Sequence, residues 1–164
     1  MKPIEIIELK RQHLERLANQ KGAAGEVKAL EEMEHWVPRP RGKALKVLLS
    51  VLQDSGISIK GSSFDAISLP NTGMVDFCDP ESVKAALPDM VFVEIKTCNQ
   101  SRVREDFSGF FFALTESEIA ASEALHSQHR VALYNESTGS MLLTSVSEIV
   151  SRAKSTNWQV SVQL

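Results

Sequence analysis

The stretch that most constrains the fold is MVFVEIKTC, residues 90–98, which combines a strand-like apolar run with two charged residues. Its apolar members are mostly β-branched or aromatic, as in buried strands, so we predict a strand over 90–97. Side chains two positions apart lie on the same face of a strand, and Glu94 and Lys96 therefore share one face. Because a buried charge is costly unless it is paired or binds a metal, this strand is expected to carry a polar site.

Hydrophobic periodicity and turn residues divide the rest of the chain into further elements. Helical spacing predicts helices at residues 3–20, 25–36, 43–54, 115–126 and 146–154. Short apolar runs predict strands within 57–70 and at 109–115, 129–135, 140–145 and 158–163, with a loop or insertion at 71–89. This order predicts one α/β (α+β) domain over residues 1–164, a mixed sheet flanked by helices. Its helical part is expected at about 1–56 and its sheet at about 57–164.

The composition is that of a soluble globular chain, with 43% hydrophobic and 24% charged residues. A net charge of −3 argues against a purely electrostatic DNA binder, but not against a metal-dependent enzyme whose site is acidic. Cys78 and Cys98 have no metal-binding spacing, and we interpret them as reduced thiols of a cytoplasmic protein. No apolar run approaches the ~20 residues that a membrane span needs.

A second acid, Asp65 in FDAISL, also lies in a short apolar run on or beside a predicted strand. If Asp65 and Glu94 are neighbours, their carboxylates repel each other unless a cation lies between them. Mg²⁺ prefers carboxylate oxygens, carbonyl oxygens and water, and the Ile95 carbonyl is a candidate third ligand. Lys96 could orient or deprotonate a water molecule, or stabilise an oxyanion. These are the parts needed to hydrolyse a phosphodiester.

Other interpretations of these residues remain open at this point. The Glu94–Lys96 pair could be an ordinary ion pair on the exposed face of an edge strand, in an α/β domain of unrelated role. Asp89 and Asp76 are alternative acids that precede the strand.

The segments FDAI and MVFVEIKT, preceded by helix-forming sequence and followed by a helix, resemble the PD-(D/E)xK nuclease superfamily, which has the restriction-endonuclease-like fold. Within it, GEVKALEEM, FDAI, FVEIKT, FALTESEIAAS and VALYNE are similar to the nuclease-like domain at the C-terminus of the plant protein NO VEIN. The resemblance spans roughly residues 22–136. It implies Asp65, Glu94, Lys96 and Glu26 as catalytic residues, with Asp65, Glu94 and Ile95 as metal ligands. Phenylalanine rather than proline precedes Asp65, which is a departure from the motif.

The resemblance implies a Mg²⁺-dependent endodeoxyribonuclease, with Mn²⁺ as a substitute, that acts in restriction or phage defence beside a partner protein of such a system. Cleavage of both DNA strands by one small subunit favours a two-fold homodimer. The alternative is a nucleic-acid-binding or assembly module of the same fold without cleavage. Glu26 has a simpler explanation as a solvated acid in the first turn of a helix.

Two basic segments are candidates for contact with the phosphate backbone. Arg39, Arg41 and Lys43 precede a predicted helix, and Arg102 and Arg104 follow the 90–97 strand. The phenylalanines at 110–112 are expected in the core rather than in a base-stacking surface. Glu118 is expected to complete a capping box with Thr115.

Overall fold

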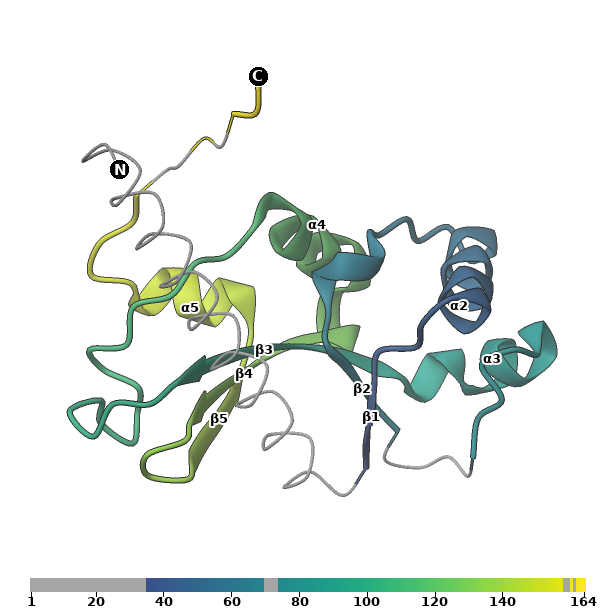
Figure 1. Cartoon of the computed structure of the whole chain (residues 1–164). Coiled ribbons are helices and arrows are strands. Elements are labelled where there is room, and N and C mark those ends of the chain that lie inside the picture. The colour runs from purple at the N-terminus through teal and green to yellow at the C-terminus, as the bar shows by residue number, and fades with distance from the viewer. Residues whose placement is uncertain (1–34, 70–73, 158–159, 161) are drawn as a thin grey trace, which may run out of the picture.

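The computed structural model describes residues 35–69, 74–157, 160 and 162–164, and the predicted helix at 3–20 lies outside these residues. The described residues form a single α/β domain in which a five-stranded mixed sheet is flanked by four helices (Figure 1). The mixed sheet expected from the sequence is confirmed. None of the helices in this part of the chain is long and apolar enough to cross a membrane.

The strands follow one another across the sheet in their order along the chain. They are β1 (Trp36–Pro38), β2 (Ala66–Ser68), β3 (Val91–Cys98), β4 (His129–Asn135) and β5 (Ser140–Thr144). The helices are α2 (Lys43–Asp54), α3 (Pro80–Ala86), α4 (Glu116–Leu125) and α5 (Val146–Arg152), with 3-10 turns η1 (Gly61–Ser63), η2 (Leu87–Asp89) and η3 (His126–Gln128). Only β3 and β4 run parallel, because the chain crosses between them through α4.

The alternation of side chains along β3 divides the core between the two sides of the sheet. Phe92 packs with Leu48 of α2 and Leu125 of α4 in a cluster on one side. Val93 and Ile95 belong to a second cluster on the opposite side. Helices α2, α4 and α5 lie on the same side of the sheet in Figure 1. Side chains of β3 that are in phase with Phe92 therefore face the helices.

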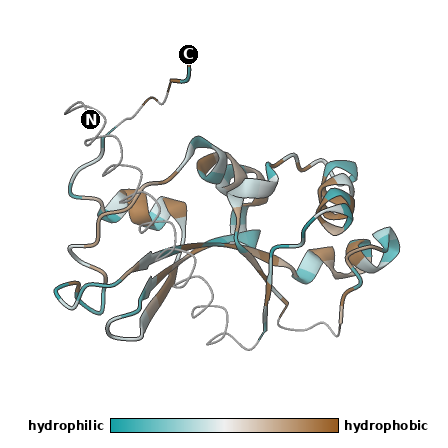
Figure 2. Ribbon diagram, viewed as in Figure 1, coloured by the Kyte–Doolittle hydropathy of each residue, from teal (hydrophilic) through white to brown (hydrophobic). Residues whose placement is uncertain are grey.

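Helix α2 confirms the prediction for residues 43–54 and shows the amphipathic pattern on which the prediction was based. Its hydrophobic residues gather on one side and its hydrophilic residues on the other (Figure 2). Leu48, Val51 and Leu52 are buried, and Gly61 of η1 packs closely against Leu45. A Cβ atom at Gly61 would lie 3.0 Å from Leu45 Cδ2, so this close approach favours glycine.

Two predictions about the middle of the chain are wrong. Residues 71–89 are not all loop, because α3 and η2 lie within them. Asp79 caps α3 by accepting a hydrogen bond from the Glu81 N–H, and Pro80 occupies the first turn, where its missing N–H costs nothing. Residues 109–115 are not a buried strand: the segment has no strand partner, and Phe111 is 85% exposed.

Predictions at the two ends of the sheet are also corrected. The helix expected at 25–36 does not extend to Trp36, which begins β1, so the sheet starts within the part predicted to be helical. Residues 25–34 lie outside the described residues. Val160 and Val162 are in no strand, although a strand was predicted at 158–163, and both side chains are exposed. The backbone groups of an exposed segment can form hydrogen bonds with water, so an alternating pattern alone does not make it a strand.

Candidate active site

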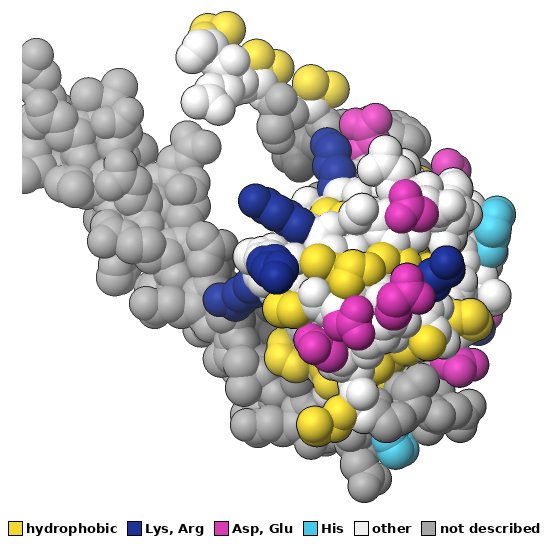
Figure 3. Space-filling model, turned by 90° about the vertical axis from the view of Figure 1, so that its right-hand side faces the viewer, with side chains coloured by type: hydrophobic (Ala, Val, Ile, Leu, Met, Phe, Trp, Pro, Cys, Tyr) yellow, Lys and Arg dark blue, Asp and Glu magenta, His cyan; other side chains and the backbone are white. Residues whose placement is uncertain are grey.

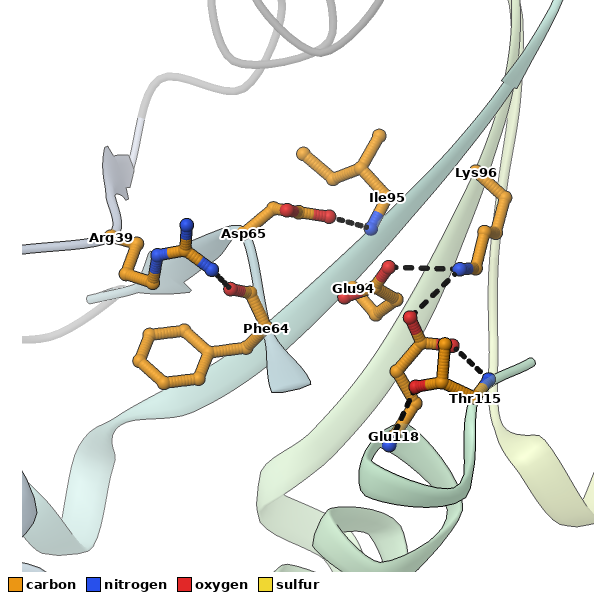
Figure 4. A network of polar contacts seen from close by, with 8 residues as sticks. All are labelled: Arg39, Phe64, Asp65, Glu94, Ile95, Lys96, Thr115 and Glu118. Carbon is orange, nitrogen blue, oxygen red and sulfur yellow. Dashed lines mark hydrogen bonds and ion pairs between the residues drawn. The ribbon is translucent and has the colours of Figure 1, made fainter. Parts of the chain in front are cut away.

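Asp65 lies immediately before β2, at the point where the pairing of β2 with β3 ends. Its N–H donates to the Val93 carbonyl at 2.8 Å, which extends the ladder by one bond. Strand β3 continues beyond this point. There the Asp65 carboxylate, rather than a backbone carbonyl of β2, accepts the hydrogen bond of the next β3 amide. Its Oδ2 accepts a hydrogen bond of 2.8 Å from the Ile95 N–H (Figure 4). The backbone of β3 therefore fixes the Asp65 side chain beside the strand that carries Glu94.

Glu94 points to the helix-covered side of the sheet, where its side chain is only 7% exposed. Because Ala66 pairs with Val93, Asp65 and Glu94 are adjacent across the two strands. Burial, reinforced by the nearby Asp65 carboxylate, raises the pKa of Glu94 from its ordinary 4.5 to about 9. Burial also raises the pKa of Asp65, against the opposing effects of the Ile95 N–H and the Arg39 guanidinium. Asp65 and Glu94 therefore lie side by side, and the charge of Asp65 acts on the Glu94 carboxyl group.

Lys96 bridges the side-chain carboxyl groups of two buried glutamates. Its Nζ lies 2.9 Å from Glu94 Oε1 and 3.0 Å from Glu118 Oε1, and its side chain is 16% exposed. Burial works to lower the pKa of Lys96, but Glu94 and Glu118 together raise it above its ordinary value. The Lys96 ammonium is therefore held in its charged form between the sheet and α4.

Glu118 connects this cluster to the start of α4. Its Oε2 accepts a hydrogen bond of 2.9 Å from the Thr115 N–H, while the Thr115 hydroxyl accepts from the Glu118 N–H, so the expected capping box is confirmed. Burial works to raise the pKa of Glu118, but the Thr115 N–H and Lys96 hold it below its ordinary value. One carboxylate thus caps the helix with one oxygen and binds Lys96 with the other (Figure 4).

The residues present fit a hard divalent cation. Glu94 Oε2 is buried and has no hydrogen-bond partner among the described residues. Burial is the main cause of the raised pKa of both Asp65 and Glu94, and a bound cation would favour the charged form of both carboxyl groups. The Ile95 N–H points to Asp65, and its carbonyl faces the same edge of β3, because both groups of a strand residue point to the same neighbour. Asp65, Glu94 and the Ile95 carbonyl would hold the ion.

This ligand set is small. In the part of the chain that the structure describes, no three or more His, Cys, Asp or Glu side chains are grouped as a metal site. Two carboxylates and a carbonyl with water in the remaining positions suit Mg²⁺, which usually keeps several waters. Glu26, the third predicted acid, lies outside the described residues. The alternative acids Asp76 and Asp89 are both exposed, and neither approaches this cluster by any hydrogen bond or ion pair found in the described residues.

No family model, curated protein or solved structure matches this chain. Its chemistry is therefore inferred from the arrangement of its own residues.

The predicted nucleic-acid-binding residues differ in what they contact. Arg39 Nη1 donates to the carbonyls of Gly61 and Phe64 at 3.0 Å each, so this side chain ties β1 to η1. Arg41 and Lys43 are exposed beside the start of α2. Figure 3, which views the side of the molecule formed by α2 and α3, shows Lys and Arg side chains gathered along one edge.

Arg102 and Arg104 are exposed in the loop that follows β3. Arg102 Nε donates to Gln100 Oε1 at 3.2 Å, within the same loop. Both guanidinium groups are accessible to a ligand.

Sequence reasoning missed the contact between Lys96 and Glu118, although it recognised each residue. The capping box in TESE marks Glu118 as a helix-start residue, and nothing in the local pattern indicates what its second oxygen binds. His129 was not singled out in the sequence, and it is 2% exposed at the start of β4. Burial lowers the pKa of His129, which keeps its ring neutral. It begins the strand directly beside β3, where Phe92 is its partner.

Proposed function

We propose that this protein is a metal-dependent endonuclease that hydrolyses phosphodiester bonds in DNA, with Mg²⁺ as its cofactor. The observation that supports the proposal is that Asp65, immediately before β2, lies across from Glu94 of β3, whose buried Oε2 has no hydrogen-bond partner among the described residues. The ammonium of Lys96 lies on the same strand face. The resemblance of FDAI and FVEIKT to the PD-(D/E)xK superfamily supports the same chemistry and suggests restriction or phage defence as its setting.

Each residue of the cluster has a role that its contacts support. Asp65 and Glu94 would hold the cation, which would supply charge neutralisation for the phosphate and a lower pKa for a bound water. Asp65 is fixed for this role by the Ile95 N–H. Lys96, charged and next to Glu94, is placed to donate a hydrogen bond to the attacking water or to a phosphate oxygen.

Glu118 is a positioning residue in this scheme. Together with Glu94 it holds the Lys96 ammonium, at 3.0 Å, and it is itself fixed by the Thr115 N–H. A flexible lysine side chain loses rotamer freedom when it must adopt a single reactive position. The pairing with Glu118 meets that cost during folding, before the substrate binds.

The proposal is tested with supercoiled plasmid DNA, incubated with Mg²⁺ or Mn²⁺ or with EDTA. We expect the wild-type protein to convert the plasmid to nicked or linear forms only when metal is present. Asp65→Asn and Lys96→Ala should each abolish cleavage. Lys84→Ala, an exposed lysine on α3, is the matched control and should cut at the wild-type rate.

Two outcomes would contradict a nuclease. If purified protein retains DNA on a gel without cutting under any metal, the fold serves as a binding or assembly module instead. If Asp65→Asn and Lys96→Ala cut as fast as the wild type, the cleavage comes from elsewhere or from a contaminant.

A further inference from the structure

Arg39 occupies the same row across the sheet as the two candidate metal ligands. Its N–H donates to the Asp65 carbonyl at 2.8 Å, which continues the pairing of β1 with β2 by one residue. Asp65 in turn lies across from Glu94 of β3. Side chains at paired positions of neighbouring strands begin about 5 Å apart. The Arg39 side chain therefore starts directly beside that of Asp65.

The guanidinium group of Arg39 is held by the backbone that carries Asp65. Its Nη1 donates at 3.0 Å to the Phe64 carbonyl, which belongs to the peptide bond that leads into Asp65 (Figure 4). The same nitrogen donates to the Gly61 carbonyl, also at 3.0 Å. These two hydrogen bonds fix the planar group before any ligand binds, which lowers the entropy cost of binding.

The positive charge of Arg39 acts on Asp65 without forming an ion pair with it. Burial raises the pKa of Asp65, and the Ile95 N–H and then the Arg39 guanidinium oppose this rise. In the described part of the chain, however, the hydrogen bonds of the guanidinium go to backbone carbonyls and not to the Asp65 carboxylate. Asp65 thus stays available to a cation, and Arg39 stays available to an anion.

Two nitrogens of the guanidinium, Nε and Nη2, are open to a ligand. They donate to no other group among the described residues, and neither belongs to the buried atoms that lack a partner, so solvent reaches them. Their N–H groups form one edge of the guanidinium plane, which matches two oxygens of a phosphate group. In Figure 4 the side chains of Asp65 and Glu94 lie between Arg39 and Lys96. A phosphate at the carboxyl pair would therefore have a cationic donor on each side.

We infer that Arg39 binds the nucleic-acid phosphate group at the candidate metal site, through its Nε and Nη2 groups. The inference rests on the proposed function, for which it names a substrate-binding residue. Because carboxylates repel a phosphate unless a divalent cation offsets their charge, binding by Arg39 is expected to require the metal. A fixed guanidinium next to the phosphate orients it and offsets its charge.

A purely structural role for Arg39 would use Nη1 alone, because the contacts to Gly61 and Phe64 both come from this nitrogen. Arg39→Lys separates the two roles. The lysine keeps the positive charge and can donate to a backbone carbonyl, but it lacks the two-nitrogen edge that matches a phosphate.

The direct test follows the Arg39 Nε–H signal by NMR in the wild-type protein, so that it depends on no variant. The probe is a 12-base-pair DNA duplex, added with Ca²⁺ in place of Mg²⁺ so that binding is separated from cleavage. We expect the duplex to shift this signal when Ca²⁺ is present and to shift it far less in EDTA. Arg152, which donates from Nη2 to the Asp106 carbonyl, supplies the control signal and should not shift in either condition.

Arg39→Lys provides the second measurement, made by calorimetry below the unfolding temperature of the variant. The loss of charge-assisted hydrogen bonds predicts duplex affinity about 10- to 100-fold weaker in Ca²⁺. Arg152→Lys is the matched control, because it alters another arginine that donates to a backbone carbonyl, and it should bind the duplex as the wild type does. Ca²⁺ titrated without DNA should bind Arg39→Lys as tightly as the wild type, since both carboxyl groups remain.

Three results would overturn the inference. The first is an Arg39 Nε–H signal that does not respond to the duplex, or duplex affinity that is unchanged in Arg39→Lys. The second is a shift of equal size in EDTA, which would place the phosphate away from the carboxyl pair. The third is a loss of Ca²⁺ binding together with DNA binding in Arg39→Lys, which would show that Arg39 only supports the local backbone.

The failure of this inference and the failure of the nuclease proposal are distinguishable. A Ca²⁺-dependent shift of the Arg39 signal without cleavage in Mg²⁺ or Mn²⁺ leaves Arg39 as the phosphate-binding residue of a non-catalytic module. Cleavage that requires Asp65 and Lys96, with no response of the Arg39 signal, leaves the nuclease intact and removes Arg39 from substrate binding.

Discussion

Glu94 is the residue at which stability and the proposed function conflict. It is buried on a core strand beside a second carboxyl group, and one of its oxygens has no partner among the described residues. Such a group destabilises a metal-free fold, and sites of this kind are retained where a ligand offsets their cost. The local sequence predicted the acid and the strand face, because alternation alone determines them. It did not predict the strength of the pKa shift of Glu94, which comes mainly from burial and is increased by the Asp65 carboxylate that the antiparallel pairing brings alongside.

The raised pKa of Glu94 predicts a specific dependence of stability on pH. Between its ordinary pKa of 4.5 and about 9, the folded protein keeps a proton that the unfolded chain releases. The free energy of unfolding therefore falls as pH rises through this window. Without metal, Glu94→Gln removes this loss, and we expect the variant to be more stable than wild type by on the order of 2 kcal/mol at pH 8.

Urea unfolding in EDTA at pH 5 and pH 8 measures this effect. The advantage of Glu94→Gln should shrink towards pH 5, because the pH then approaches the ordinary pKa of 4.5 and little of the window in which stability is lost has been crossed. A variant that is less stable than wild type at pH 8 would show that the Glu94–Lys96 pair, and not the repulsion from Asp65, dominates.

The two contacts of Glu118 predict that mutations can separate its effect on helix capping from its effect on catalysis. Glu118→Gln keeps an oxygen that accepts from the Thr115 N–H but removes the charge that holds Lys96. We expect it to lower the cleavage rate about 10- to 100-fold, the range typical of residues that orient a reactive group. Thr115→Ala is the matched control: it removes the hydroxyl cap, costs about 1 kcal/mol of stability and should leave cleavage little changed.

Single-turnover cleavage and thermal unfolding of both variants give the two readouts. Cleavage at the wild-type rate by Glu118→Gln, or equal losses of activity in both variants, would show that Glu118 acts only on the helix.

At the scale of elements, the connection between the parallel strands β3 and β4 completes the candidate site. Its helix α4 packs over the sheet, and Glu118 in the first turn of α4 contacts Lys96. Strand β3 and helix α2 were predictable because their apolar spacing is long and regular. The three-residue strand β1 was not, since Pro38 indicates a break and is tolerated only because β1 is an edge strand. Residues 109–115 form an apolar run that has no partner strand among the described residues. The strand that was predicted from their composition is therefore absent.

The connection between β1 and α2 predicts different roles for two neighbouring arginines. Arg39 donates to two backbone carbonyls of the η1 region, so Arg39→Ala should lower the free energy of unfolding by about 1–3 kcal/mol. Arg41 is exposed, and Arg41→Ala should change stability by less than about 0.5 kcal/mol. Urea unfolding of the two variants distinguishes them. Equal destabilisation, or none in Arg39→Ala, would contradict the structural role given to Arg39.

At the scale of the whole molecule, a net charge of −3 means that DNA binding must depend on local cationic groups rather than on the overall field. Arg41 and Lys43, exposed together beside α2, are the strongest candidates in the described part of the chain. Each phosphate contact that is lost should reduce the slope of log K against log salt by about 1.

Duplex binding, measured at several salt concentrations with Ca²⁺ present, tests whether Arg41 and Lys43 contact the phosphate backbone. Arg41→Ala and Lys43→Ala should each weaken binding and flatten the salt dependence, whereas Lys84→Ala should do neither. Unchanged slopes in the first two variants would place the DNA on another face of the domain.

The most direct test of the site is a crystal structure of the protein soaked in Mn²⁺, with the ion located by its anomalous scattering. We predict one peak at about 2.0–2.3 Å from oxygens of both Asp65 and Glu94, with the Ile95 carbonyl as a further ligand. The peak should be absent from crystals of Asp65→Asn. No peak between these carboxylates, or a Mn²⁺ ion bound elsewhere while this position stays empty, would contradict the metal centre and with it the proposed nuclease.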